Sequence, residues 1–189
     1  MLRGLATSGG EPPEPRGRGQ ALALLSEAAE AWPRRESCWF AAVQVLDLAG
    51  AALGAPALDL ARAAAAWLLV TKLDAETELG DGAAHTLAGM ASAISQEAGG
   101  GEVSRKAILQ EEMYLICTLG QWIGAPTASS WVTAILTRFE VAMGSKLTEE
   151  LRSVRDEALQ LARERLAKEP VSSSCRPHAV AVQACSSAL

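Results

Sequence analysis

The sequence predicts an all-α protein, a helical bundle around a central alanine-rich helix followed by part of a second bundle. The chain has 189 residues, of which 49% are hydrophobic and only 4% are aromatic. Runs of β-branched residues long enough for a strand are missing, whereas apolar residues recur at helical spacing. Because alanine fills the space that aromatic side chains usually take, we expect closely packed helices.

The central helix is expected over residues 58–73. The segment that begins at Leu58 reads LDLARAAAAWLLVTKLDAE, and small residues recur on several of its faces. A helix that is apolar nearly all round is buried in the middle of a bundle. We therefore expect it to contact the helices near 37–53 and 104–120.

Helix breakers and capping residues divide the rest of the chain, for a total of about eight helices. The others are expected over residues 18–32, 37–53, 83–97, 104–122, 127–143, 147–168 and 176–189. Ser104 and Thr127 have the side chains that cap helix N-termini, and Pro33 ends the first helix. Residues 1–16, rich in Gly, Pro and Glu, are expected to be disordered.

Two of these helices carry a recognisable apolar stripe. The helix over 104–122 is expected to turn five residues inward, namely Ile108, Met113, Leu115, Ile116 and Leu119. The helix over 147–168 is strongly charged, and its partial stripe consists of Leu151, Val154, Leu159, Leu161 and Leu166.

Charge and hydropathy restrict the partners. The net charge of -5 argues against nucleic acid, which needs a clustered basic face. The longest apolar run, Ala63–Thr71, is too short to span a bilayer, and the N-terminus lacks the apolar core of a signal peptide. We expect a soluble intracellular protein that binds neither nucleic acid nor membrane.

The sequence contains no recognisable catalytic or metal-binding pattern. The four cysteines form no CxxC pair, and His85 and His178 have no ligand spacing with them. Reduced, buried thiols are therefore expected, with no metal and no cofactor. The serines at 172–174 lie beside His178 without a strand–turn–helix context, which favours a loop over a catalytic site. We do not expect an enzyme.

Lys72 allows two interpretations. It stands at the end of the helix expected over 58–73, where a cation suits the negative end of the helix dipole. Alternatively, it is a contact point for a partner. Helix physics alone favours the capping role.

Three segments resemble the cyclin family. They are FAAVQVLDLAG from Phe40, ARAAAAWLLVTKLDAE from Ala61, and VSRKAILQEEMYLICTLGQWIGAPTASSWV from Val103. The resemblance implies a cyclin-box-like domain over residues 17–125 and a partial second box over 126–189, cut off in its third helix.

The resemblance implies a regulatory subunit that binds and activates a cyclin-dependent protein kinase in cell-cycle control, in the nucleus or the cytoplasm. Cyclins use a lysine and a glutamate as a polar pair that reaches the kinase, and these fall on Lys72 and Glu112. Asp74, in the acidic element that follows Lys72, is assigned to the same interface. The alternative for Glu112 is a solvent-facing residue beside Glu111.

The resemblance also implies a structural ion pair between Arg18 and Asp47, which ties the first helix to the second. Breaking one partner of a buried ion pair is costly. The alternative is that Arg18 only ends a basic loop with Arg16.

The chain departs from the family pattern in ways that affect function. Cell-cycle cyclins carry large apolar residues in a substrate-docking groove, where this chain has Gly17–Ala21 and Leu24. The Arg-Phe expected after Asp47 is Leu48-Ala49. These departures keep a rival open: a cyclin-fold scaffold, or a transcription-factor-like or retinoblastoma-like binding module, without kinase activation.

Overall fold

All regular structure in the described part of the chain is helical. The computed structural model describes residues 17–32, 36–53, 59–74, 82–143, 148–172 and 175–189, and these contain eight α-helices, one short 3₁₀ helix and no strand. The elements are α1 Arg18–Ala31, α2 Glu36–Leu53, α3 Leu60–Leu73, α4 Ala83–Glu97, α5 Arg105–Leu119, η2 Gly120–Gly124, α6 Ala128–Ala142, α7 Thr148–Lys168 and α8 Pro177–Ala188. The predicted all-α fold is confirmed.

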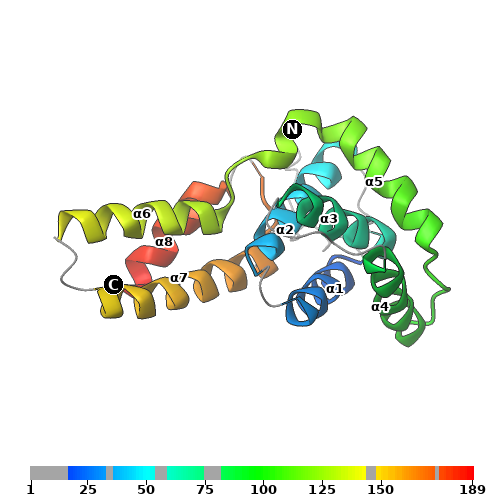
Figure 1. The fold of residues 1–189 in the computed structure, drawn as a ribbon, viewed down its shortest axis with the longest axis horizontal. Helices are drawn as coiled ribbons and strands as arrows, with labels where there is room; N and C mark the ends of the chain where they lie inside the picture. Colours follow the sequence, from blue (N-terminus) through cyan, green and yellow to red (C-terminus); the bar gives the residue numbers. More distant parts are fainter. Residues whose placement is uncertain (1–16, 33–35, 54–58, 75–81, 144–147, 173–174) are drawn as a thin grey trace, which may run out of the picture.

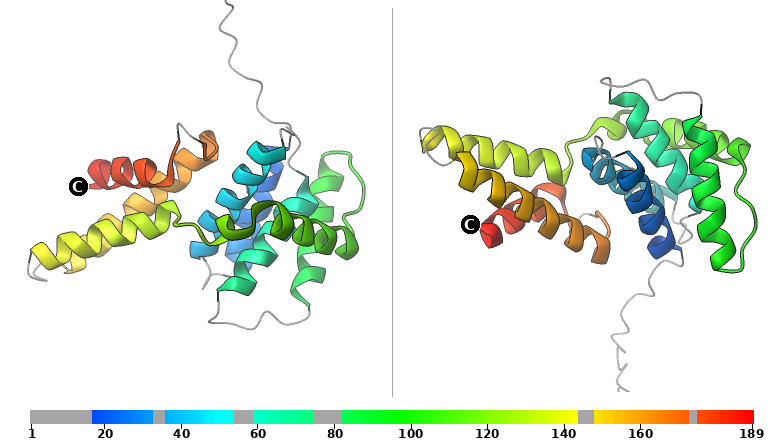
Figure 2. Two further views of the ribbon diagram at one scale, coloured as in Figure 1. Left: turned by 90° about the horizontal axis from the view of Figure 1, so that it is seen from above. Right: turned by 60° about the horizontal axis from the view of Figure 1, so that its bottom comes forward.

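The helices form two groups that lie side by side (Figure 1). Helices α1 to α5 pack around α3, while α6, α7 and α8 pack on one another beside them. The two further views in Figure 2 show the same separation, with η2 and the segment before α6 joining the groups. Residues 1–16, for which disorder was predicted, lie outside the described residues.

Helix α3 is the central element of the first bundle. It packs against α1, α2, α4 and α5, and the side chains from Ala63 to Trp67 are fully buried. Asp59 caps its N-terminus by accepting a hydrogen bond from the backbone N–H of Ala61 at 3.1 Å. The prediction that this helix is buried, against the helices near 37–53 and 104–120, is confirmed.

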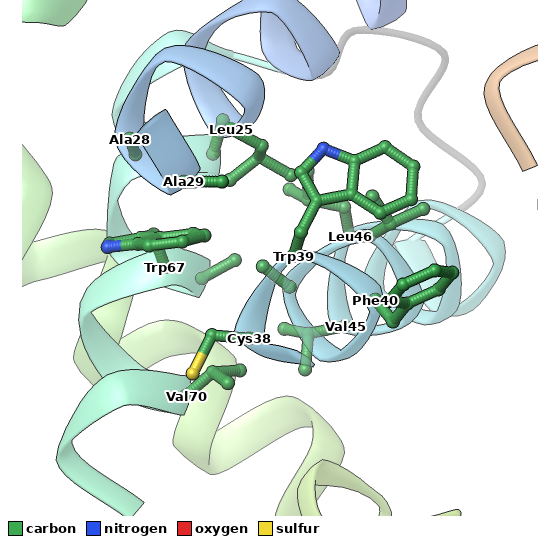
Figure 3. Packing of buried hydrophobic residues seen from close by; sticks show 14 of the residues in the cluster. Leu25, Ala28, Ala29, Cys38, Trp39, Phe40, Val45, Leu46, Trp67 and Val70 are labelled. Atoms are coloured by element: carbon green, nitrogen blue, oxygen red, sulfur yellow. The ribbon is translucent and has the colours of Figure 1, made fainter. Parts of the chain in front are cut away.

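Three aromatic residues, Trp39, Phe40 and Trp67, are buried in the core of the first bundle (Figure 3). Trp67 of α3 and Trp39 of α2 both lie next to the side chains of Leu25 and Ala29 of α1. The ring of Trp39 meets Phe40 edge-on, with centroids 5.2 Å apart. Small residues elsewhere on α3 let the neighbouring backbones approach closely, as in densely packed interiors.

Helix α5 begins as predicted and ends earlier. The Ser104 hydroxyl accepts a hydrogen bond from the Ala107 N–H at 3.1 Å, which caps the first turn. The helix was expected to reach residue 122 but stops at Leu119, because Gly120 adopts a left-handed φ of 49°. The chain continues as the 3₁₀ helix η2.

Two of the five residues predicted to point inward from α5 point outward. Met113 is 59% exposed and Ile116 is 39% exposed. The buried residues Ile108, Leu115 and Leu119 follow one stripe at helical spacing, and Glu112 completes it. A residue one position away from a stripe is turned by about 100° around the helix, so Met113 misses the core.

The second bundle is held by small residues as well as leucines. On α7 the buried residues are Leu151, Ala158, Ala162 and Leu166, whereas the predicted stripe residues Val154, Leu159 and Leu161 are only half-buried. The buried stripe of α7 therefore combines two alanines with two of the predicted leucines. Thr127 caps α6 as predicted, accepting from the Ser130 N–H at 3.3 Å.

The cysteines are free thiols, and three of the four are buried. Cys38, Cys175 and Cys185 are buried, while Cys117 on α5 is exposed, contrary to the prediction of buried thiols throughout. Burial raises the pKa of the Cys175 and Cys185 thiols. Among the described residues, no group of His, Cys, Asp and Glu side chains could hold a metal ion, and no helix is long and apolar enough to cross a membrane.

Candidate partner-binding site

Lys72 and Glu112 form an ion pair between the last turn of α3 and the middle of α5. The Lys72 Nζ lies 2.7 Å from Glu112 Oε1 and 2.8 Å from Oε2, so the ammonium bridges both oxygens of the carboxylate. Charge-assisted hydrogen bonds of this length are among the stronger polar contacts in proteins. The two residues that the cyclin resemblance assigned to one site are thus in direct contact.

The two members of this pair differ in exposure. The Lys72 side chain is 48% exposed, while that of Glu112 is only 8% exposed. The alternative of a solvent-facing Glu112 is therefore wrong. An ammonium group carries three N–H donors, and Glu112 accepts two hydrogen bonds. The third N–H of the Lys72 ammonium is not used by Glu112. Because the Lys72 side chain is half-exposed, this N–H can donate to an acceptor on a partner.

A second ion pair positions α5 relative to α3. Arg62, near the start of α3, donates to Glu111 at 2.8 Å and lies over the Tyr114 ring at 5.9 Å. Arg62 and Lys72 are ten positions apart, about 15 Å along the helix axis, yet they reach adjacent residues of α5. The two helices therefore cross, and the two ion pairs fix the crossing.

The Arg62 contact was missed in the sequence. The available signal was the adjacent pair Glu111 and Glu112, matched by two cations, Arg62 and Lys72, on the helix that the pattern had already placed at the centre. Two neighbouring carboxylates on a helix point in different directions. Only the crossing of α3 over α5 brings Arg62 to Glu111 and Lys72 to Glu112.

Asp74, the third predicted interface residue, has a different environment. It follows the last residue of α3, and its carboxylate accepts a hydrogen bond from the Cys38 thiol of α2 at 3.6 Å. It lines a hollow of about 260 Å³, together with residues of α2, η2 and the start of α6. Asp74 therefore faces the junction of four elements, and its described contact is with Cys38 rather than with Lys72.

Exposed apolar side chains lie next to the Lys72–Glu112 pair. Leu73, which follows Lys72, is 59% exposed, and Met113, which follows Glu112, is also 59% exposed. Ile116, one turn further along α5, is 39% exposed. The Lys72–Glu112 pair therefore stands among exposed apolar side chains, and methionine is one of the residue types enriched in protein interfaces.

Arg18 and Asp47 form the ion pair expected between the first two helices. Arg18 Nε donates to Asp47 Oδ1, and Arg18 Nη2 donates to Oδ2, both at 3.2 Å. Both side chains are buried, at 7% and 2% exposure. The alternative of a solvated basic loop for Arg18 is therefore wrong.

The same ion pair holds the second bundle. Arg18 donates to the backbone carbonyl of Leu166 at 2.7 Å and to that of Ala167 at 2.9 Å, both in the last turn of α7. Asp47 accepts from the Val171 N–H at 2.8 Å. Burial raises the pKa of the Asp47 carboxyl, and the hydrogen bonds from Arg18 and Val171 partly offset that rise.

A third contact at the junction involves α7 and an aromatic residue of α2. The Arg163 guanidinium lies over the Trp39 ring, 4.8 Å from its centroid, and donates to the Ser26 hydroxyl at 3.2 Å. The two bundles are thus joined by charged side chains that contact backbone, hydroxyl and ring, and these contacts lie apart from the Lys72–Glu112 pair.

Comparison of the chain with protein-family models, with curated proteins and with solved structures finds no match.

Proposed function

We propose that the chain is a regulatory subunit that binds and activates a cyclin-dependent protein kinase in cell-cycle control. The observation that supports this proposal most directly is the Lys72–Glu112 ion pair, at 2.7 Å, with a buried carboxylate and a half-exposed ammonium. The cyclin resemblance of the sequence assigns these two residues to one kinase-binding site, and their direct contact supports a shared role.

The chemistry of this site is recognition rather than catalysis. Lys72 offers a donor to a partner backbone, and the exposed Leu73, Met113 and Ile116 offer apolar area around it. A bound partner would remove the half-exposed Lys72 ammonium from water, and desolvated charged pairs at an interface can carry a large share of the binding energy. The proposal therefore assigns no catalytic residue to the chain.

A second candidate is a cyclin-fold scaffold or transcription-factor-like binding module that does not activate a kinase. The observation that favours it is on α1, where Leu24 occupies the position of a large docking residue in cell-cycle cyclins and is fully buried. Gly19, on the same helix, is exposed and offers no side chain. A surface without this docking groove suits a module that does not recruit kinase substrates.

The test is a pull-down of the full chain against a panel of cyclin-dependent kinases, followed by a kinase assay on a histone substrate. We expect at least one kinase to bind and to gain activity over the free kinase. A kinase that binds without gaining activity would favour the scaffold. The absence of binding across the panel would overturn the kinase proposal, provided that a known cyclin binds in the same assay.

A further inference from the structure

We propose that the chain forms a weak homodimer through an apolar face of the second bundle. The dimer face consists of Trp131, Ile135 and Phe139 on α6, and of His178, Val182 and Leu189 on α8 and at its end. The second bundle forms one end of the molecule, away from α4 and α5 (Figure 1). Self-association is independent of the proposed kinase contact, which lies on the first bundle.

The two halves of the dimer face lie side by side. On α6, Trp131, Ile135 and Phe139 are four positions apart, so they follow one side of the helix. The ring of Trp131 meets that of His178 with centroids 6.1 Å apart, which places the first turn of α8 against the start of this stripe. From there α6 and α8 run in the same direction (Figure 2). Val182, one turn after His178, therefore lies on the same side as Ile135.

The dimer face is apolar and open to solvent. The exposed fractions are 41% for Trp131, 39% for Phe139, 53% for Val182 and 66% for Leu189. Exposed apolar side chains that gather in one place are a feature of interaction sites. Aromatic residues are also enriched, and charged residues depleted, at the centre of protein interfaces. The composition of this face is therefore that of a surface which another protein covers.

Helix α8 is less well covered than its sequence leads one to expect. From Pro177 to Leu189 the chain has no Asp, Glu, Lys or Arg, and a helix without charge is usually buried on all sides. The apolar helix α3 of the first bundle packs against four helices, whereas α8 packs mainly against α6 and α7. The described part of the chain leaves the Val182 side of α8 uncovered. A second molecule is needed to bury that side.

The distribution of charge favours a second copy of the chain. The net charge is -5, so two copies repel each other except where they meet without carboxylates. Most charged side chains of the second bundle belong to α7, and the dimer face has none. A membrane suits this face less well, because helices on membrane surfaces carry Lys and Arg beside their apolar side. Helices α6 and α8 together have one Arg, Arg138, and no Lys.

The dimer face is complementary to itself about a two-fold axis that crosses α6 at Ile135 and α8 at Val182. Trp131 and Phe139 are each four positions from Ile135. In an antiparallel pairing, Trp131 of one copy therefore lies opposite Phe139 of the second copy, and aromatic pairs stabilise an interface beyond the area they bury. Arg138, which is exposed, then reaches the Trp131 ring of the second copy as a cation–π contact. Each contact occurs twice, because the interface is symmetric.

The size of the dimer face limits the affinity. Two adjacent helices, one of them the 15-residue α6, cover a surface about 22 Å long and about 20 Å wide, or about 450 Å² per copy. Stable interfaces bury about 800 Å² per partner. The face therefore suits a reversible dimer that forms at high concentration rather than a permanent one.

The experiment is analytical ultracentrifugation of the full chain under reducing conditions. Concentrations from about 5 to about 500 μM bracket a dissociation constant in the micromolar range. We expect the weight-average mass to rise with concentration from the monomer value of 19.8 kDa toward twice that value. A chain that stays at the monomer mass over the whole range would overturn the proposal.

Charge variants test the choice of face. Val182→Glu places two like charges at the two-fold axis and should raise the dissociation constant at least about ten-fold. The control is Thr137→Glu, which adds the same charge at an exposed position turned by about 200° around α6 from Ile135, and it should leave the dimer intact. Circular dichroism verifies that both variants are folded. Equal weakening by the two variants would overturn the choice of this face.

The antiparallel arrangement has its own test. Arg138→Ala removes two cation–π contacts and should weaken the dimer by about five-fold or more. In a Cys117→Ser background, Val182→Cys should give a disulfide-linked dimer on mild oxidation, because a disulfide needs Cα atoms about 4.4–6.8 Å apart. Thr137→Cys should stay monomeric. Crosslinking through position 137 and not through position 182 would overturn the arrangement.

Two further arms separate this inference from the proposed function and from membrane binding. Lys72→Ala should leave the dimer unchanged, since Lys72 belongs to the first bundle. A chain that dimerises without binding any kinase would support the inference and overturn only the kinase proposal. Vesicles of phosphatidylcholine should not bind the chain, and vesicle binding that Val182→Glu abolishes would overturn the choice of a second copy.

Discussion

Arg18 and Asp47 form a buried ion pair, and each of the two side chains also makes hydrogen bonds to the backbone of the second bundle. Their side chains join α1 to α2, while Arg18 also holds the last turn of α7 and Asp47 accepts the N–H of Val171. The guanidinium carries five donors in a fixed fork, and four of its hydrogen bonds are accounted for by these contacts. This pair, together with the contacts of Arg163 to Trp39 and Ser26, therefore joins the two bundles.

We expect Asp47→Ala to lower the free energy of unfolding by about 3–5 kcal/mol. The substitution leaves the Arg18 charge buried and removes the acceptor of the Val171 N–H. Chemical denaturation measures the change. Asp156→Ala, which breaks an exposed pair with Arg155, is the control and should stay within about 0.5 kcal/mol of wild type. An Asp47→Ala transition that coincides with that of wild type would contradict the prediction.

Ala65→Leu should lower the free energy of unfolding by about 1–3 kcal/mol, because an added isopropyl group must enter a filled core. Ala65 is fully buried in α3, between several neighbouring helices. The matched control is Ala134→Leu on α6, where the alanine is exposed and the change should be within about 0.5 kcal/mol. Thermal melts of the two variants compare the sites, and equal melting temperatures would refute the close packing of α3.

Gly120→Ala should destabilise the chain by about 1–3 kcal/mol, because Gly120 has a φ of 49°, which side chains with a Cβ rarely adopt. Gly19→Ala provides the opposite case. It lies within α1, with open space around its Cβ position, and alanine there should stabilise by up to about 1 kcal/mol. Denaturation midpoints of both variants measure the difference, and a neutral Gly120→Ala would show that the turn after α5 can relax.

Lys72→Ala and Glu112→Ala should each weaken association with a cyclin-dependent kinase by about 2–5 kcal/mol. Since the two side chains are in direct contact, the double variant should lose less than the sum of the single losses. Calorimetry against a kinase identified in the pull-down measures all three. Arg155→Ala, on the outer charged helix, should have almost no effect. Additive losses would show that the two residues act separately.

The sequence by itself determined the fold class and the order of the helices. Helical periodicity predicted α3 and its buried alanines, since a helix apolar on every side has no stable place except the interior. The local capping patterns predicted where α5 and α6 begin, because Ser104 and Thr127 satisfy backbone N–H groups a few residues away. Periodicity and capping depend only on residues a few positions apart, so both can be predicted without knowledge of the tertiary structure.

The tertiary structure alone decided which faces and partners the residues use. Met113 was expected inside and lies outside, whereas Glu112, one position earlier, is buried. A stripe of apolar residues defines a broad face, and only the crossing of α3 over α5 selects which position meets the neighbouring helix. The contacts of Arg18 with α7 bridge about 150 positions, and no local pattern encodes a hydrogen bond to a backbone carbonyl so distant in sequence. Such pairings form only when α1 and α7 pack together. Burying an unpaired charge is unfavourable, so the buried Arg18 is stable only where the fold supplies acceptors for its hydrogen bonds.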